Sequence, residues 1–167
     1  RLSGEPIVAI GKVFAMDSES AISAFNFKSG RQVWETNITP KDENDGHING
    51  GLSYEDGIIY AATGFAQIVA LDANNGKILW RKLLGAPLRS PPTARGGRVF
   101  TVTLNNEVYA LNSKTGKELW KHSGLPETTS ILGGASPAVD QGTIVVPYSS
   151  GQLIALRVDN GRLLWEE

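Results

Sequence analysis

The sequence predicts an all-β fold, a β-propeller of four antiparallel four-stranded blades, and three observations support this prediction. The first is a pattern that occurs four times, with an alanine ten residues and a glycine four residues before a tryptophan. The second is the interval between these tryptophans, 46, 40 and 45 residues, which is a typical length for one propeller blade. The third is that no stretch of ten or more residues carries a sustained helical period.

The chemistry of one copy explains its spacing. In residues 70–80 an apolar strand enters a turn rich in Asp, Asn and Gly, and a second strand leaves it. The glycine stands where the loop requires a positive φ. We expect each Trp ring to lie over this turn and against the alanine of a neighbouring blade, burying roughly 150–250 Å², so that replacement by Ala costs about 3–5 kcal/mol. The residues with this structural role are Ala24, Gly30, Trp34, Ala70, Gly76, Trp80, Ala110, Gly116, Trp120, Ala155, Gly161 and Trp165.

Each blade is expected to hold four short strands joined by tight turns, because the connections are too short for parallel crossovers. The expected blades are residues 1–39, 40–82, 83–122 and 123–167 of one continuous propeller segment. The expected strands of the first two blades are 6–10, 12–16, 22–27, 32–37, 51–54, 58–63, 68–72 and 78–82. Those of the last two blades are 92–94, 99–104, 107–112, 118–122, 136–139, 143–148, 152–158 and 163–166.

The second and third strands of the blades are apolar on both faces, as in residues 58–61 and 144–146. A sheet that is wetted on one face would alternate apolar and polar residues. The strands are therefore expected to lie between neighbouring sheets, and function is expected to concentrate in the inter-blade segments 39–49, 83–91 and 123–135.

Charge and composition exclude several classes of function. Sixteen Lys and Arg against 17 Asp and Glu leave a net charge of −1, which argues against binding to nucleic acid or to an anionic membrane. The absence of cysteine excludes disulfides, thiol nucleophiles and Cys-based metal sites. No apolar run is long enough to span a membrane. Because the chain begins at Arg1 and stops two residues after the last Trp, we expect a piece of a longer protein.

No motif for catalysis, phosphate binding or a cofactor is found, so no catalytic, cofactor or metal residue is assigned. Asp42, Glu43, Asp45 and His47 could ligate a hard cation, but their spacing is not that of an EF-hand loop and a solvated connector is preferred. His122 is interpreted as a solvent-facing imidazole at the end of an outer strand, since no nucleophile is near it in the sequence.

Two inter-blade connections carry aliphatic residues where polar ones are usual, in segments 83–89 and 130–134. Packing at the blade ends is the preferred interpretation, and a docking surface is the alternative. In the second case the partner-binding residues would be Leu88, Arg89, Ile131 and Leu132.

The repeated pattern, most complete in ALDANNGKILW and ALNSKTGKELW, resembles the pyrroloquinoline-quinone-type propeller repeat over nearly the whole chain. Within that superfamily, LRSPPTARGGRVF and LGGASPAVDQGTIVVPYSSGQLIAL look most like the BamB family of outer-membrane assembly factors. This resemblance implies an eight-bladed ring, of which four blades are present. It also implies a non-catalytic scaffold in the periplasm, held at the inner face of the outer membrane by an N-terminal lipid anchor and bound to the barrel-forming subunit BamA.

The chain departs from that family in having no Cys to lipidate and no arginine in the loop that opens blade four. Two alternatives stay open: a fragment of a quinoprotein dehydrogenase, and a periplasmic sensor or ligand-binding propeller of the kind found in kinase-related proteins. The absence of cysteine disfavours the first, because those enzymes resemble this chain in their blades but hold their quinone with an adjacent Cys pair.

Half of an eight-bladed ring would leave the outer faces of the first and last blades exposed. We expect these faces to be covered, most simply in a homodimer that completes the ring about a two-fold axis.

Overall fold

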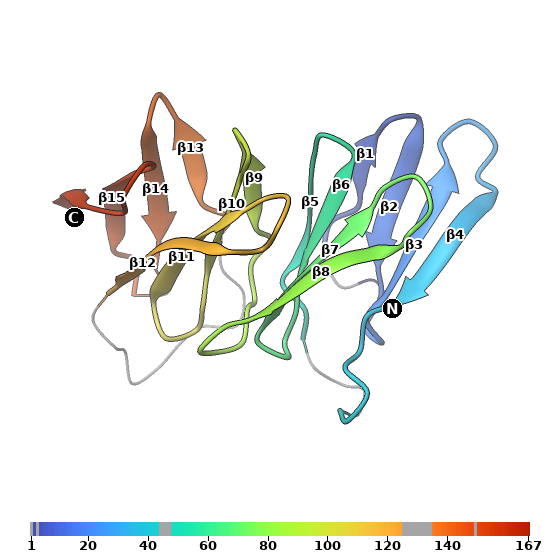
Figure 1. Cartoon of the computed structure of the whole chain (residues 1–167), viewed down its shortest axis with the longest axis horizontal. Helices are drawn as coiled ribbons and strands as arrows, with labels where there is room; N and C mark the ends of the chain where they lie inside the picture. Colours follow the sequence, from blue (N-terminus) through green and yellow to red (C-terminus); the bar gives the residue numbers. More distant parts are fainter. Residues whose placement is uncertain (1, 3, 44–47, 125–134, 149) are drawn as a thin grey trace.

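The computed structural model describes residues 2, 4–43, 48–124, 135–148 and 150–167, and within these residues every regular element is a β-strand (Figure 1). The strands form four separate sheets of four strands, and each sheet follows the order of the chain. All neighbouring strands pair antiparallel. The prediction of an all-β protein with four antiparallel four-stranded blades is confirmed.

The first two blades occupy the first half of the chain. The strands of blade 1 are β1 (Ile7–Ala9), β2 (Lys12–Met16), β3 (Ala21–Asn26) and β4 (Gln32–Asn37). The strands of blade 2 are β5 (Gly51–Glu55), β6 (Ile58–Ala62), β7 (Gln67–Asp72) and β8 (Ile78–Leu83). Strand β8 ends one residue beyond the blade boundary expected from the sequence.

The last two blades repeat the arrangement. The strands of blade 3 are β9 (Thr93–Arg95), β10 (Arg98–Val102), β11 (Glu107–Asn112) and β12 (Glu118–Ser123). The strands of blade 4 are β13 (Ala138–Asp140), β14 (Thr143–Pro147), β15 (Leu153–Arg157) and β16 (Leu163–Glu166). Strand β12 also runs one residue past its expected boundary.

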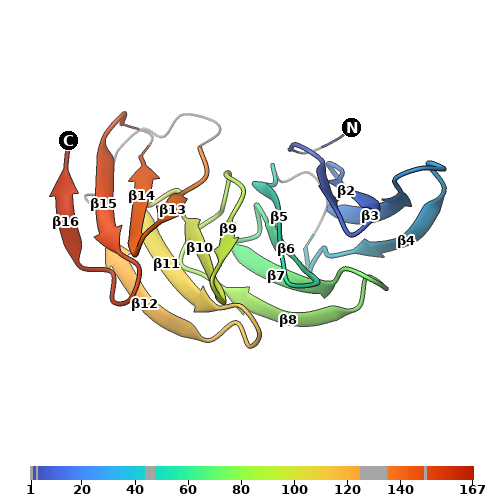
Figure 2. The ribbon, with the colours of Figure 1, turned by 90° about the horizontal axis from the view of Figure 1, so that it is seen from above.

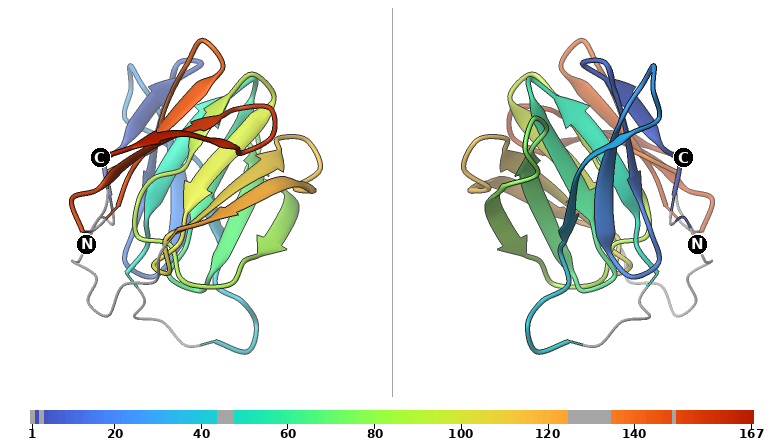
Figure 3. Two further views of the ribbon diagram at one scale, coloured as in Figure 1. Left: turned by 90° about the vertical axis from the view of Figure 1, so that its left-hand side faces the viewer. Right: turned by 90° about the vertical axis from the view of Figure 1, so that its right-hand side faces the viewer.

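The four sheets stand side by side in an arc, with blade 1 at one end and blade 4 at the other (Figure 2). The first strand of each blade lies on the inner side of the arc, where β5 contacts β1 and β9, and β9 contacts β13. The fourth strands β4, β8, β12 and β16 lie on the outer side (Figure 2). Figure 3 shows the stacked sheets from both ends of the arc, with blade 4 in front in the left view and blade 1 in front in the right view.

The hydrophobic core consists of three layers, each between two neighbouring blades. Phe14 of blade 1 packs with Ile59 and Leu71 of blade 2, and the next two layers join blades 2 and 3 and blades 3 and 4 in the same way. Consecutive residues of β6, β7, β10 and β11 are buried, as predicted for sheets covered on both faces. In β2 and β14 burial alternates, because blades 1 and 4 each have a neighbour on one face only.

Hairpin turns at one end of the blades also join neighbouring sheets. The carboxylate of Glu55 in blade 2 accepts hydrogen bonds from the backbone N–H groups of Gly96 and Gly97 in blade 3. In turn, the guanidinium of Arg95 donates to the carbonyl of Val139 and pairs with Asp140 in blade 4. These contacts fix the hairpin ends of consecutive blades against each other.

Candidate protein-interaction site

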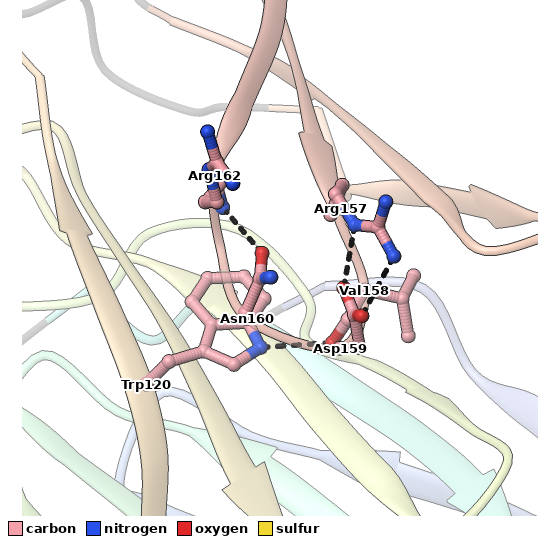
Figure 4. A network of polar contacts seen from close by, with 6 residues as sticks. All are labelled: Trp120, Arg157, Val158, Asp159, Asn160 and Arg162. Atoms are coloured by element: carbon pink, nitrogen blue, oxygen red, sulfur yellow. Dashed lines mark hydrogen bonds and ion pairs between the residues drawn. The ribbon is translucent and has the colours of Figure 1, made fainter.

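Three of the four repeat tryptophans donate a hydrogen bond to the turn of the blade that follows. The bonds run from the indole Nε1 to a backbone carbonyl: Trp34 to Ala73 at 3.2 Å, Trp80 to Ser113 at 3.0 Å and Trp120 to Val158 at 2.8 Å. Figure 4 shows Trp120 on the turn of blade 4. We call each such turn with its ring a tryptophan-docking site. The ring lies over the turn of the next blade rather than its own, because a strand side chain stands perpendicular to its sheet while its own turn lies in that sheet.

The glycine of each docked turn makes room for the ring. A Cβ built on the glycine would lie 2.5–2.6 Å from Cε3 of the docked indole, a distance that real Cβ contacts do not reach. The pairs are Gly76 with Trp34, Gly116 with Trp80 and Gly161 with Trp120. Their φ angles of +73°, +68° and +70° also lie in the left-handed region that favours glycine. Both the backbone conformation and the contact with the ring therefore require glycine.

The repeat alanine lies in the same sheet as the tryptophan, directly opposite it across the third and fourth strands. The prediction that the ring lies over the turn of its own repeat and against the alanine of a neighbouring blade is therefore wrong. Each of the four alanines is fully buried. Beside the alanine, on the second strand, an aromatic ring contacts the tryptophan in the first three blades. The centroid distances are 5.8 Å for Phe14 and Trp34, 6.0 Å for Tyr60 and Trp80, and 6.0 Å for Phe100 and Trp120.

Tyr60 makes this aromatic contact and also reaches the docking site of blade 3. Its hydroxyl donates to the carbonyl of Ser113 at 3.2 Å, the same carbonyl that accepts from Trp80. Burial raises the pKa of Tyr60 to about 12. One carbonyl of blade 3 thus holds two aromatic side chains of blade 2.

The tryptophan-docking pattern is incomplete at both ends of the arc. Trp165 is 45% exposed, against 8% for Trp120, and no described blade follows it. At the other end Gly30 has the docked conformation, with φ +67°, but no atom lies within 4 Å of its built Cβ.

The connector between blades 2 and 3 is packed against the sheets. Leu88 is fully buried in the core cluster that contains Tyr60 and Val99, and its N–H donates to the carbonyl of Thr63 at 3.1 Å. Leu84 is buried in the same cluster. Leu84 and Leu88 of this connector are therefore part of the core, and Leu88 presents no surface to a partner.

Of the other predicted contact residues, the structure describes Arg89 but not Ile131 and Leu132. Arg89 is half-buried, and its Nε is buried without a hydrogen-bond partner among the described residues. Ile131 and Leu132 lie outside the described residues. Leu83, expected in the apolar connector, lies at the end of β8 with 67% of its surface exposed.

A polar cluster that the sequence did not reveal lies at the connector end of blade 3. The Lys121 ammonium pairs with the Glu107 carboxylate at 2.5 Å, and the Tyr109 hydroxyl donates to the same carboxylate at 3.0 Å. The hydrogen bond from Lys121 is the main cause of the lowered pKa of Glu107, and that bond raises the pKa of Lys121. Gly85 of the connector faces this cluster, because its built Cβ would lie 2.7 Å from Oε2 of Glu107. The cluster thus lies close against the connector at Gly85.

Residues considered for metal binding or acid–base chemistry do not converge in the described structure. Asp42 and Glu43 are exposed, while Asp45 and His47 lie outside the described residues. His122 is half-buried on β12, opposite Val108. Within the described part of the chain no group of three or more His, Cys, Asp or Glu side chains could hold a metal ion, and no helix could cross a membrane.

Solved structures with the same arrangement of sheets show the fold. The chain superposes on BamB from Moraxella catarrhalis with a TM-score of 0.84 and 21% identity, covering 98% of this chain and 48% of that one. It superposes on the quinohemoprotein alcohol dehydrogenase ADHIIG from Pseudomonas putida with a TM-score of 0.78 and 18% identity, covering 97% of this chain and 33% of that one. The fold is therefore that of a pyrroloquinoline-quinone-type β-propeller.

The family within this class follows from the sequence comparison. A family model described as outer membrane protein assembly factor BamB matches residues 18–167, so the chain belongs to the BamB family. BamB of Yersinia pestis is 26% identical over 160 residues, which cover 93% of this chain and 41% of that protein. An uncharacterised protein of Rickettsia conorii is 33% identical over 162 residues, covering 96% of this chain and 39% of that protein. The chain thus spans about two fifths of the length of these relatives.

Proposed function

We propose that this chain is a non-catalytic protein-binding scaffold, a BamB-like subunit of the machinery that assembles β-barrels in the outer membrane. The observation that carries the proposal is the family match over residues 18–167, and several relatives are named as outer membrane protein assembly factors. In this proposal the protein acts in the periplasm, is held at the outer membrane by an N-terminal lipid anchor, and binds the barrel subunit BamA.

The packing supports a scaffold whose contacts come from the ends of its blades. The second and third strands of blades 2 and 3 are committed to the inter-blade core, and we expect turns and connectors to meet a partner. The connectors after β4 and β8 reach the same end of the arc (Figure 1). We propose Arg89 as a partner contact at this connector end, and Ile131 and Leu132 stay partner contacts proposed from the sequence. Leu88 is left out because it is fully buried.

The dehydrogenase alternative rests on fold alone, since the quinoprotein structures that match are less than 25% identical to this chain. The resemblance to those enzymes implies an adjacent Cys pair at the quinone, and this sequence contains no cysteine. The scaffold is therefore the better-supported function.

The first test is recovery of the partner from the cell envelope. The full-length parent protein is isolated from solubilised envelope, and the copurifying proteins are identified by mass spectrometry. We expect the barrel-assembly subunit to be recovered. A preparation that carries a quinone and oxidises alcohols in a dye-linked assay, with no assembly subunit, would overturn the scaffold proposal.

The second test examines the connector end directly. Arg89→Glu and the double change of Ile131 and Leu132 to Asp are expected to weaken binding to purified BamA about tenfold or more, as for residues at the centre of an interface. Lys114→Glu is the matched control, because it reverses one exposed charge at the opposite end of the outer strand β12. Equal binding by all variants would remove these residues from the contact surface.

We further propose a second copy of the chain as another partner, one that covers the open faces of blades 1 and 4 and completes a ring.

A further inference from the structure

The outer strands of blades 2 and 3 carry an excess of positive charge that the net charge of the chain hides. We call residues 77–83 and 117–123, which are β8 and β12 each with the residue before it, the basic outer surface. The rest of the chain has 11 Lys and Arg against 16 Asp and Glu, a net charge of −5. The basic outer surface has a net charge of +4, from five cations and one anion: Lys77, Arg81, Lys82, Lys117, Lys121 and Glu118.

The fold of a blade does not require these cations. The equivalent residues of blade 1, 31–37, have no net charge, and those of blade 4, 162–167, have a net charge of −1. Directly after the repeat tryptophan, blades 2 and 3 have Arg81 and Lys121, whereas blades 1 and 4 have Glu35 and Glu166. The position therefore accepts either sign of charge, and the basic residues are particular to the two middle blades.

Two of the cations are held in fixed positions. An Nη of Arg81 donates to the carbonyl of Ile38 at 2.7 Å and to the side-chain oxygen of Gln67 at 3.3 Å. Lys121 is held by its ion pair with Glu107. The other four cations of the surface, Arg81 included, form no ion pair with a carboxylate among the described residues. The surface thus keeps most of its positive charge uncompensated.

A half-exposed leucine lies among the cations on each outer strand. Strand β7 pairs with Ile78 and Trp80 and leaves Leu79 between them unpaired. Strand β11 leaves Leu119 of β12 unpaired in the same way. Such a β-bulge re-aims the side chain of an edge strand. Leu79 and Leu119 are each 45% exposed, although blades 2 and 3 both lie between two other blades (Figure 2).

We propose that the basic outer surface binds an acidic segment of another protein. Carboxylates of that segment meet Lys77, Lys117 and the cations around them, and its apolar side chains cover Leu79 and Leu119. Opposite charges steer the encounter, and burial of the leucines adds affinity. The bulges interrupt the free edges of β8 and β12, so side chains hold the segment and it does not join a sheet as a further strand. This site goes beyond the proposed contact with BamA at the connector end.

The geometry favours a protein segment over an anionic membrane. The indoles of Trp80 and Trp120, the side chains best suited to enter a membrane interface, are turned into their docking sites. The outer side of the arc is convex, so a flat bilayer meets less of it than a polypeptide that follows the arc (Figure 2). Arg81 and Lys121 are also fixed by their partners, an order that mobile lipid headgroups do not need.

The first experiment measures binding of a labelled synthetic peptide, a repeat of Glu-Glu-Leu, to the full-length parent protein by fluorescence anisotropy. We expect the dissociation constant to rise about tenfold when the salt concentration is raised from about 0.05 to about 0.5 M. A peptide with Gln in place of Glu should bind at least about tenfold less tightly. Equal binding of the two peptides contradicts the proposal. Binding of phosphatidylglycerol vesicles without binding of the acidic peptide would assign the surface to a membrane and overturn it.

Charge reversal locates the peptide on the surface. Lys77→Glu and Lys117→Glu should each raise the dissociation constant about fivefold. Arg31→Glu is the matched control, because Arg31 is exposed at the same position of blade 1 and lies outside the surface. Arg31→Glu should change the constant less than about twofold, and so should Arg89→Glu, which separates this site from the connector end. An equal effect of Arg31→Glu and Lys77→Glu contradicts the proposal.

The leucines test the apolar part of the contact. Leu79→Ala and Leu119→Ala should each raise the dissociation constant of the acidic peptide about fivefold, because each removes apolar area that the peptide buries. Val33→Ala is the control, since Val33 holds the same bulge position in blade 1 and is 47% exposed. It should leave binding unchanged. The urea midpoints of all these variants should equal that of the unchanged protein, and an effect of Val33→Ala as large as that of Leu79→Ala overturns the proposal.

The natural partner is tested by photo-crosslinking in the cell envelope. A photoreactive residue replaces Leu79 in the full-length parent protein, and the crosslinked segment is identified by mass spectrometry. We expect a protein segment with an excess of Asp and Glu, and we expect the crosslink to be lost when Lys77→Glu and Lys117→Glu are added. A crosslink to lipid, a crosslink to a segment without excess negative charge, or no crosslink at all overturns the inference.

Discussion

Replacement of Gly116 by alanine tests the tryptophan-docking site inside the chain. A Cβ there would lie 2.6 Å from Cε3 and 2.8 Å from Cδ2 of Trp80, and φ is +68°. The left-handed backbone costs a residue with Cβ about 1–2 kcal/mol, and displacement of the packed ring costs about 1–3 kcal/mol more. We therefore expect Gly116→Ala to lower the free energy of unfolding by about 2–5 kcal/mol.

Gly96→Ala separates the two costs. It lies in the same blade, its φ is +64°, and no atom lies within 4 Å of its built Cβ. Only the backbone cost of about 1–2 kcal/mol is expected there. Urea unfolding followed by far-ultraviolet circular dichroism measures the loss of stability in each glycine variant. The same two variants are then compared in a Trp80→Ala background. There Gly116→Ala should lower the free energy of unfolding no more than Gly96→Ala does. Equal losses in the unchanged chain, or an excess that persists without Trp80, would refute the reasoning.

The remaining predictions concern burial and titration. Trp120→Ala should lower the free energy of unfolding, measured in urea, by about 3–5 kcal/mol. Trp165→Ala should lower it by clearly less in the monomer, because the Trp165 side chain is 45% exposed. Leu88→Ala should cost about 2–5 kcal/mol and the exposed Leu83→Ala within about 0.5 kcal/mol by the same method. Tyr60 should ionise near pH 12 in an absorbance titration. Because the pKa of Tyr60 is raised in the folded state, its protonated form contributes stability that is fully present below the ordinary tyrosine pKa of about 10. This contribution is lost as the pH rises toward 12. Tyr60→Phe should abolish the loss. For Glu107, whose pKa is lowered, the dependence of stability on pH is opposite. Its contribution to stability is present above the ordinary glutamate pKa of about 4.3 and is lost on further acidification. Glu107→Gln should remove that part of the acid dependence of the unfolding midpoint.

The strand pattern could be predicted because its signals are local. Apolar runs, glycine turns and the repeat length place strands such as β6 and β11 within a residue or two of their observed bounds. Each signal acts over a hairpin of about ten residues, through backbone conformation and the two-residue period of a strand. None of them depends on which sheet lies beside which.

The candidate site could be predicted only in part. The aliphatic residues of the connector at 83–91 can be recognised in the sequence. Aliphatic residues occur both in a core and on a docking surface, so the sequence does not tell these two roles apart. Only the structure shows that Leu88 is buried while Leu83 is exposed. The sequence carried no signal for the cluster of Glu107, Tyr109 and Lys121. Lys121 lies on a different strand, and the register of β11 and β12 brings it to the other two residues. Ile131 and Leu132 stay predictions.

By itself the sequence determined the four hairpin repeats, the absence of cysteine chemistry and the glycine that each docked turn requires. Only the tertiary structure decided which turn receives each indole. A tryptophan side chain leaves its own sheet at a right angle and reaches whatever stands beside that face, so its partner is set by the stacking of blades and not by nearness in sequence. For Trp34, Trp80 and Trp120 that partner is the next blade. For Trp165 the same geometry leaves an exposed ring at the end of the arc.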